Sequence, residues 1–484
     1  MRSHSINTST LKVFFLQTLF LNIFCLVFNQ TILLSQSKQI WSDIIGTAYL
    51  NNVSYSILER LCDEAGGRLI GSEQNKKAMT ILSEELRKIE LEPYREGFQF
   101  PGWHRGIDEV TMLNPIERSL RAVALAYVDY TPEFTADMID GQFGFDSDYS
   151  VNEALGKIVL VNQEKPIGKD SPLRYESLGL AAKRGAKAVL FINDKLGGLV
   201  IDGVTSFLGI PAPIPAYSVT LEEGKWLKRL LERNQKVTLK IKTESRCKSI
   251  DSSENTIVTL AGKTKKKIVI GAHFDSWDLG QGAVDNGHGT AILCDVARIL
   301  NKLSKINYYT LEFVWFNGEE FGLWGSRKYY EKHKNENIEL MINMDMTGSV
   351  TGFNAMGNDE LLPYLKDICE KLKGFNMKDG INNSPWINSD QQYFMLGGIP
   401  TITPNGTLDR DMTWHYHDFG DTFDKVNIRY LSDAAAIVSV LVYELANNEN
   451  LNLHLKNREE VKKKMIEAGL EKRLRKQGQW EFGD

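Results

Sequence analysis

The chain has little of what several specialised protein classes depend on. Of its 484 residues only 13 are proline and 42% are hydrophobic, which excludes a wholly disordered, collagen-like or polytopic membrane chain. The net charge is −5, so there is no basic excess of the kind that binds nucleic acid. The five cysteines form no Cys-x-x-Cys motif, which argues against a thiolate metal site. Histidine is scarce at 8, so any imidazole chemistry has few candidates.

The N-terminal segment has the pattern of an export signal. Arg2 precedes a mostly apolar run at residues 11–28, and a small-x-small triplet follows at 35–37. A basic start, an apolar stretch and a small-residue site are typical of a secretory signal. We predict that residues 1–37 are a signal peptide or, if uncleaved, a membrane anchor. The protein is therefore expected to be exported to a secreted, periplasmic or other extracytoplasmic location.

The rest of the chain divides into three regions that differ in sequence pattern and composition. Residues 38–106, expected to be helical up to about residue 100, and residues 250–446 are assigned to one split domain. Residues 107–249 contain short β-rich runs and one clear helix, which predicts a compact β-rich insert. Residues 447–484 form a basic tail, which we expect to be a solvated helix or a frayed end.

Strands and helices alternate in the split domain from residue 255. Strands are expected at 256–260, 267–270, 310–316, 340–344 and 400–403, and helices at 288–303, 322–334, 360–372 and 430–446. This alternation predicts an α/β fold with a mixed, mostly parallel sheet flanked by helices. In such sheets the chemistry collects at the carboxyl ends of the strands.

Acidic and imidazole side chains follow three of the apolar strands: His273, Asp275, Glu319, Glu320 and Asp345. One histidine two residues before an acid is expected by chance in a chain with 62 acids, so the pair at 273 and 275 alone carries little weight. Carboxylates at the ends of buried strands are costly without a cation to pair with. The convergence of three strand ends therefore indicates a metal site.

Two loops add further potential ligands. Asp285 lies in the glycine-rich loop at 280–289, and His415 and His417 lie at 414–418, before the last predicted helix. Imidazoles and carboxylates suit Zn²⁺ or a similar divalent ion. A two-metal centre needs one bridging carboxylate, and of two adjacent glutamates one can ligate while the other takes a proton from water. Structural zinc prefers closed cysteine-rich shells, so a catalytic site is favoured.

The motifs at these positions resemble those of the di-zinc exopeptidases of peptidase family M28. The similar stretches are GAHFDSWDLGQGAVDNGHG at 271–289, FNGEEFG at 316–322, NMDMTG at 343–348 and HDFGDT at 417–422. The resemblance extends over roughly residues 45–445. It implies the zinc-dependent exopeptidase fold, and the insert resembles a protease-associated domain.

The resemblance implies a metal-binding role for five side chains. His273 and Asp345 would bind one Zn²⁺, and Glu320 and His417 would bind a second. Asp285 would bridge the two ions, and the peptide bond that follows it would be cis.

Further residues would serve catalysis and substrate binding. Glu319 is implied as the general base, and Asp275 as an outer contact that orients His273. His415 is either a substrate contact or a plain loop residue. The segment 389–394, with Asp390 and Tyr393, is expected to line the substrate pocket.

These roles predict a zinc metallo-exopeptidase that hydrolyses short peptides or dipeptides, as a carboxypeptidase or dipeptidase. An aminopeptidase of the same family is the alternative. A glutaminyl cyclase-like acyltransferase, which would hold one zinc, and a non-catalytic binding ectodomain are alternatives from other classes. No nucleic acid is expected as a partner, a membrane only if the N-terminal segment stays uncleaved, and homodimer formation is left open.

Overall fold

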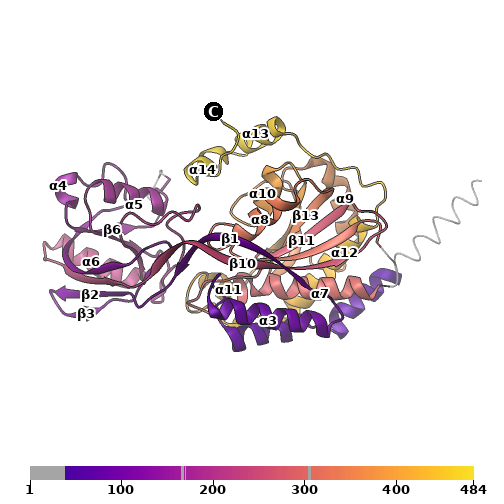
Figure 1. Ribbon diagram of the computed structural model, residues 1–484, viewed down its shortest axis with the longest axis horizontal. Coiled ribbons are helices and arrows are strands. Elements are labelled where there is room, and N and C mark those ends of the chain that lie inside the picture. The colour runs from indigo at the N-terminus through magenta and orange to yellow at the C-terminus, as the bar shows by residue number, and fades with distance from the viewer. Residues whose placement is uncertain (1–38, 165–167, 169, 304–306, 484) are drawn as a thin grey trace, which may run out of the picture.

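The computed structural model describes residues 39–164, 168, 170–303 and 307–483, so the predicted export segment at 1–37 lies outside the described residues. Two eight-stranded sheets lie one beyond the other along the long axis of the molecule (Figure 1). We call the part built on the sheet that holds β11 the body, and the part built on the other sheet the insert. Among the described residues, no helix combines the length and apolar character needed to cross a membrane.

The body sheet has the strand order β1-β10-β12-β11-β13-β16-β14-β15. Its central strands β12, β11, β13 and β16 are parallel, and β14 and β15 are parallel to each other. The pairs β1–β10, β10–β12 and β14–β16 are antiparallel. The prediction of a mixed α/β sheet flanked by helices is therefore confirmed. The strands are β1 (Tyr94–His104), β10 (Arg246–Leu260), β11 (Lys267–His273), β12 (Thr310–Phe316), β13 (Ile338–Asn343), β14 (Ser349–Asn354), β15 (Gly380–Asn382) and β16 (Thr401–Thr407).

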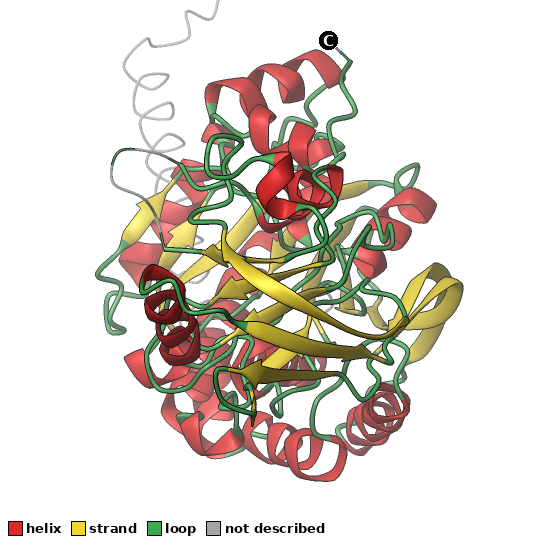
Figure 2. Cartoon of the chain, turned by 90° about the vertical axis from the view of Figure 1, so that its left-hand side faces the viewer, coloured by secondary structure: helices red, strands yellow, loops and turns green. Residues whose placement is uncertain are grey.

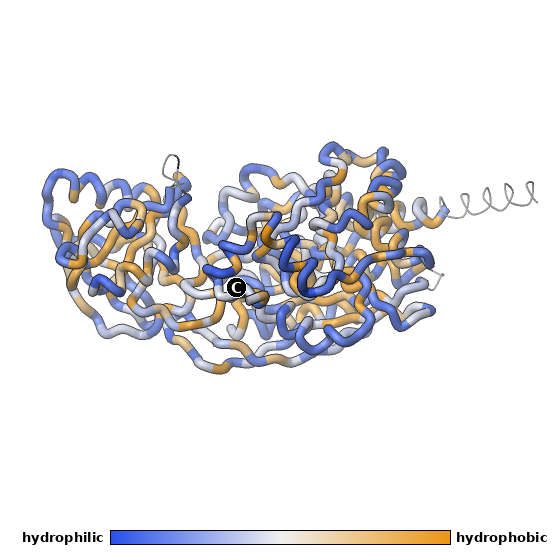
Figure 3. Tube along the Cα trace, turned by 90° about the horizontal axis from the view of Figure 1, so that it is seen from above, coloured by the Kyte–Doolittle hydropathy of each residue, from blue (hydrophilic) through white to orange (hydrophobic). Residues whose placement is uncertain are grey.

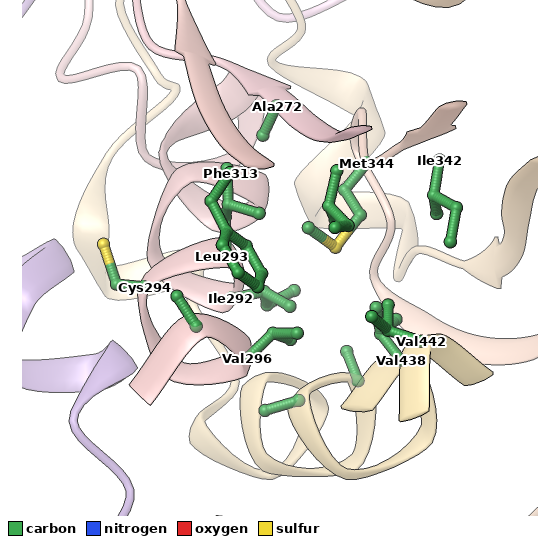
Figure 4. Packing of buried hydrophobic residues seen from close by; sticks show 14 of the residues in the cluster. Ala272, Ile292, Leu293, Cys294, Val296, Phe313, Ile342, Met344, Val438 and Val442 are labelled. Atoms are coloured by element: carbon green, nitrogen blue, oxygen red, sulfur yellow. The ribbon is translucent and has the colours of Figure 1, made fainter. Parts of the chain in front are cut away.

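Helices cover both faces of the body sheet (Figure 1), and seen from the insert end they lie above and below the strands of the molecule (Figure 2). Because side chains alternate along a strand, Ile268 and Ile270 of β11 enter the core under α7 and α12, whereas Val269 enters the core under α8 and α10. Figure 4 shows the first of these cores, where α7 and α12 close over the sheet. The body helices are α2 (Ser54–Arg60), α3 (Glu73–Lys88), α7 (His288–Lys302), α8 (Trp324–His333), α9 (Leu362–Lys371), α10 (Gln391–Leu396), α11 (Arg410–Trp414) and α12 (Ile428–Ala446), with short turns η1 (Leu61–Ala65), η2 (Ala283–Gly287), η3 (Asp359–Leu361) and η4 (Phe423–Lys425).

The insert sheet is built entirely from strands between residues 109 and 243, in the order β3-β2-β9-β5-β6-β7-β8-β4. Its strands are β2 (Glu109–Asn114), β3 (Arg118–Ser119), β4 (Ala122–Ala124), β5 (Thr131–Asp140), β6 (Ile158–Asn162), β7 (Ala188–Ile192), β8 (Ala216–Val219) and β9 (Thr238–Thr243). Three helices accompany them, α4 (Val151–Ala154), α5 (Arg174–Lys183) and α6 (Leu221–Glu232), where the sequence predicted one.

A two-stranded antiparallel ribbon of β1 and β10 joins the body to the insert (Figure 1). Its register shifts between Phe100 and Gly102, and a Cβ at Gly102 would lie 2.7 Å from the Cβ of Asp251. The prediction that the chain is helical up to about residue 100 is therefore wrong from Tyr94 onward. Phe98 and Phe100 are apolar at alternate positions, which is the period of a strand rather than that of a helix.

The C-terminal segment corrects a second expectation, because it is packed rather than solvated. Helices α13 (Arg458–Glu467) and α14 (Glu471–Lys476) bury Met465 and Leu474 completely against residues that include Ile387 and Met395. Seen from above, this segment lies over the junction of body and insert (Figure 3). Lys476 forms a 2.7 Å ion pair with Glu176 of the insert helix α5.

Candidate metal centre

The structure brings the five predicted ligands together at the carboxyl ends of the central strands. His273 ends β11, Glu320 follows β12 and Asp345 follows β13, while Asp285 lies in η2 and His417 lies after α11. Two groups form, one of His273, Asp285 and Asp345 and one of Asp285, Glu320 and His417, each with potential ligand atoms within 4.8 Å of one another.

Asp285 belongs to both groups and offers one oxygen to each. Its Oδ1 lies 3.2 Å from His273 Nε2, and its Oδ2 lies 3.2 Å from His417 Nε2. Asp345 Oδ1 completes the first group at 3.5 Å from His273 Nε2, and Glu320 Oε2 completes the second at 3.1 Å from His417 Nε2. This is the arrangement expected of a carboxylate that bridges two cations. The peptide bond between Asp285 and Asn286 is cis.

The chemistry of the donors fits divalent cations. Within the part of the chain that the structure describes, His417 Nε2 makes no hydrogen bond, although carboxylate oxygens of Asp285 and Glu320 lie within 3.2 Å, and Glu320 Oε1 is also buried without a partner. Burial, followed by the nearby Asp285 carboxylate, raises the pKa of Glu320 to about 7 against the lowering effect of His417. Buried carboxylates and imidazoles aimed at one another without hydrogen bonds are the donors that a cation such as Zn²⁺ would satisfy.

Glu319 stands next to both groups and is held by Asp275. The two oxygens of the Asp275 carboxylate accept hydrogen bonds from the backbone N–H groups of Glu319, at 3.1 Å, and Glu320, at 3.3 Å. The carbonyl oxygen of Asp275 lies 3.1 Å from Nδ1 of His273. Burial, together with the carboxylates of Asp345 and Glu320, raises the pKa of Glu319 well above its usual range.

The three residues suggested as substrate contacts lie in different surroundings. Asp390 is fully buried, its carboxylate oxygens have no hydrogen-bond partner among the described residues, and burial raises its pKa to about 7. Tyr393 faces the C-terminal segment, where its hydroxyl accepts a hydrogen bond from Gln479. His415 belongs to neither ligand group and lines an open cavity of about 730 Å³.

Several residues around the ligands were missed by sequence reasoning. The Asp421 carboxylate accepts hydrogen bonds from the backbone of Val284 and Asp285 and so holds the loop that carries Asp285. Arg68 is completely buried and donates to the carbonyl oxygens of Phe274, Gln281 and Gly282. Because these hydrogen bonds of the Arg68 guanidinium go to backbone oxygens, the sequence contains no side-chain pattern that would predict them.

Tyr416 was also missed, although it lies between the two histidines of its loop. Its ring stacks on His417 with centroids 3.7 Å apart. Burial, together with the carboxylates of Asp285, Glu320 and Glu319, raises the pKa of its phenol well above the usual range. The phenol therefore stays protonated and can donate a hydrogen bond beside the candidate metal centre.

The insert also reaches this centre. The backbone carbonyl oxygen of Asp202 lies 3.4 Å from His417 Nδ1 and accepts a 3.2 Å hydrogen bond from Arg174 Nη1. Arg174 Nε donates to Gln163 Oε1 at 3.0 Å, and Arg174 forms no ion pair among the described residues. A cationic group from the insert thus lies behind the second ligand group.

Comparisons with known proteins show which families and relatives the chain resembles. Residues 255–442 match the model of peptidase family M28. The chain is 28% identical to carboxypeptidase Q of Rattus norvegicus over 412 residues, covering 83% of this chain and 86% of the relative. It is 25% identical to aminopeptidase YwaD of Bacillus subtilis over 416 residues, covering 82% and 85%.

Solved structures share the fold. A peptidase M28 precursor from Shewanella amazonensis superposes with a TM-score of 0.74 at 23% identity, covering 87% of this chain and 99% of that one. BSAP, a zinc aminopeptidase from Bacillus subtilis, gives a TM-score of 0.67 at 23% identity, with 82% and 95% covered. The chain therefore resembles members of peptidase family M28 in sequence and shares the fold of solved peptidase structures.

Proposed function

We propose that the protein is a di-zinc exopeptidase that hydrolyses short peptides with a free C-terminus, as a carboxypeptidase or dipeptidase. The observation that carries the two-metal assignment is the position of Asp285, whose oxygens are each 3.2 Å from a different histidine. His273 and Asp345 would hold one ion and Glu320 and His417 the other, with Asp285 shared between them.

When bound, the zinc ions would lower the pKa of the attacking water and polarise the scissile carbonyl. Glu319 takes the proton from that water and returns it to the leaving amine, a role that suits a carboxylate of raised pKa. Asp275 fixes the backbone of Glu319, so the base is positioned before substrate arrives. Tyr416 donates a hydrogen bond to the oxyanion that develops on the scissile carbonyl.

Arg174 supports recognition of the substrate's C-terminus. Its guanidinium donates to the Asp202 carbonyl oxygen that His417 also approaches, and burial lowers the pKa of Arg174 against the raising effects of Asp202 and Tyr416. A guanidinium can bind a carboxylate through two parallel hydrogen bonds, whereas it would repel a substrate ammonium group. Aminopeptidase activity is the second candidate, supported by the similarity to aminopeptidase YwaD.

Blocked dipeptides test the proposal directly. The zinc-loaded enzyme is expected to hydrolyse an N-acetylated dipeptide and to lose most of its activity when the C-terminus is amidated. Activity on amidated but not on N-acetylated substrates would establish the aminopeptidase instead. Zinc content measured on the same preparation should be close to two ions per chain, and a value close to one would favour the acyltransferase alternative.

We also propose that the insert is a protease-associated domain and that the protein is exported. The first proposal is supported by the separate sheet that the chain forms between β1 and β10, and the second by the sequence of residues 1–37.

A further inference from the structure

The backbone of His417 adopts an unusual conformation that the surrounding structure must maintain. Its φ is +56°, in the left-handed region that a residue with a side chain enters at a cost of roughly 1–2 kcal/mol. The segment that carries it, residues 413–418, runs from the end of the short helix α11 into the loop before the turn η4. Neither element is long enough to fix this loop by itself, so contacts from elsewhere must hold it.

Those contacts come from the insert. Among the described residues, five close polar contacts join residues 195–202 of the insert to residues 413–418 of the body. They are Asp202 N–H to the His417 carbonyl oxygen at 3.0 Å, His417 Nδ1 to the Asp202 carbonyl oxygen at 3.4 Å, Val200 N–H to Asp418 Oδ2 at 2.9 Å, Lys195 Nζ to the Thr413 carbonyl oxygen at 3.0 Å and Trp414 Nε1–H to the Leu196 carbonyl oxygen at 3.1 Å. Asp202 thus meets His417 on both its backbone and its imidazole ring.

Asp202 is itself fixed by Arg105, which follows β1 at the passage from body to insert. The Asp202 carboxylate is fully buried and pairs with Nη2 of Arg105. The same guanidinium binds Asp278 through Nε at 2.7 Å and Nη2 at 3.0 Å, and donates through Nη1 to the Ala124 carbonyl oxygen at 2.8 Å. Arg105 therefore ties the insert segment that holds His417 to the loop that follows His273.

We propose that Arg105 and Asp202 are positioning residues that set the orientation of His417 from the insert, so that the insert forms part of one of the two metal sites. The inference rests on the proposed function, since it concerns His417 as a ligand. A metal-bound imidazole needs its second ring nitrogen held by an oxygen acceptor, and loss of such a contact typically lowers metal affinity about 10- to 100-fold. Here the acceptor is the carbonyl oxygen of Asp202, and the carboxylate of the same residue anchors it.

Zinc titration tests this without relying on activity. Zinc bound per chain is measured over a series of buffered free-zinc concentrations for the wild type, Asp202→Ala and Arg105→Met, with His417→Ala marking the step that belongs to its site. We expect Asp202→Ala and Arg105→Met to weaken that step about 10- to 100-fold and to leave the other step unchanged. Asp202→Asn, which keeps a side-chain acceptor for Gly203, should show a smaller loss in the same direction.

Asp137→Ala is the matched control, because Asp137 pairs with Lys157 within the insert. Circular dichroism establishes that each variant is folded, and Asp202→Asn decides the matter if Asp202→Ala does not fold. Wild-type zinc binding in folded variants, or an equal weakening of both steps, would overturn the inference. A wild type that binds fewer than two zinc ions would instead overturn the proposed function.

Discussion

Arg174 and His417 approach the same atom from two parts of the molecule. Arg174 Nη1 lies 3.2 Å from the carbonyl oxygen of Asp202, and His417 Nδ1 lies 3.4 Å from it. One backbone oxygen of the insert thus links the cation proposed to bind the substrate's carboxylate to a proposed metal ligand. Substrate binding and metal binding therefore share a support that does not belong to the body.

Replacing Arg174 by Met should abolish the preference for a free C-terminus. Loss of one partner of a buried, hydrogen-bonded charge pair costs about 2–5 kcal/mol, so kcat/KM for an N-acetylated dipeptide should fall roughly 30-fold or more. The C-amidated form of the same dipeptide lacks the carboxylate and should be turned over equally by variant and wild type. Arg184→Met is the control, because Arg184 caps the other end of α5 and pairs with Asp146. Equal losses on both substrates would refute the assignment.

Replacing Glu319 by Gln should remove the base and keep the metals. We expect kcat to fall about 10²- to 10⁴-fold, the usual contribution of general acid–base catalysis, with zinc content still close to two per chain. Glu73→Gln, on an exposed position of α3, serves as the control. Wild-type turnover of Glu319→Gln would show that another group takes the proton.

Replacing Tyr416 by Phe removes one hydroxyl and keeps the ring that stacks on His417. Removal of one donor to a developing oxyanion costs about 10²- to 10³-fold in kcat. KM should change little, because this hydrogen bond forms mainly in the transition state. A rise in KM at constant kcat would instead assign Tyr416 to ground-state binding.

Removal of the metals should destabilise the body. A ligand at 1,000 times its Kd adds about 4 kcal/mol to the free energy of unfolding. Without the metal ions, the buried carboxylates of Asp285 and Glu320 have no cation to neutralise their negative charge. Exhaustive chelation should lower Tm, and added zinc should restore it. A Tm that does not respond to chelation, with zinc shown to be absent, would contradict a metal site at this position.

His333 provides a test of pH-dependent stability away from the metal centre. Its imidazole lies between the carboxylates of Glu96, at 3.0 Å, and Glu336, at 2.9 Å. Burial lowers the pKa of His333, but these hydrogen bonds outweigh it and raise the pKa above the usual range. The contribution of protonated His333 to the free energy of unfolding is therefore fully present below the unfolded pKa of about 6.5. It is lost as the pH rises through the pKa of His333 in the folded protein.

The variant His333→Gln should consequently lose more unfolding free energy at pH 6 than at pH 9. Hydrogen bonds to charged groups are worth about 1.5–3 kcal/mol, which sets the size of the loss at the lower pH. Urea unfolding at both pH values, at equal zinc concentration, measures it. A loss that is equal at the two pH values would mean that His333 acts only by packing on Tyr329.

The sequence indicated much of the body and of the ligand set, because both follow from short-range patterns. The apolar run of β12 predicted its bounds at 310–316, and the polar residues after it marked the strand end. β1 was missed because Glu96 interrupts the alternation of apolar residues and the bulge at Gly102 shifts it. Burial of the C-terminal segment could not be read from its composition, since only a few residues such as Met465 and Leu474 face inward among many charges.

The contacts that the insert makes with His417 could not be predicted from the sequence. Asp202 contacts His417 mainly through its backbone, and because every residue has the same backbone groups, residue type does not predict such contacts. Arg174 and His417 are separated by more than 240 positions, and only the folded chain brings them together.

The β1–β10 ribbon constrains how the two parts of the molecule can move. The chain enters and leaves the insert through strands that are hydrogen-bonded to each other, rather than through two independent linkers. The insert therefore cannot swing like a tethered domain, and any rotation must bend both strands together, most easily at the bulge between Phe100 and Gly102.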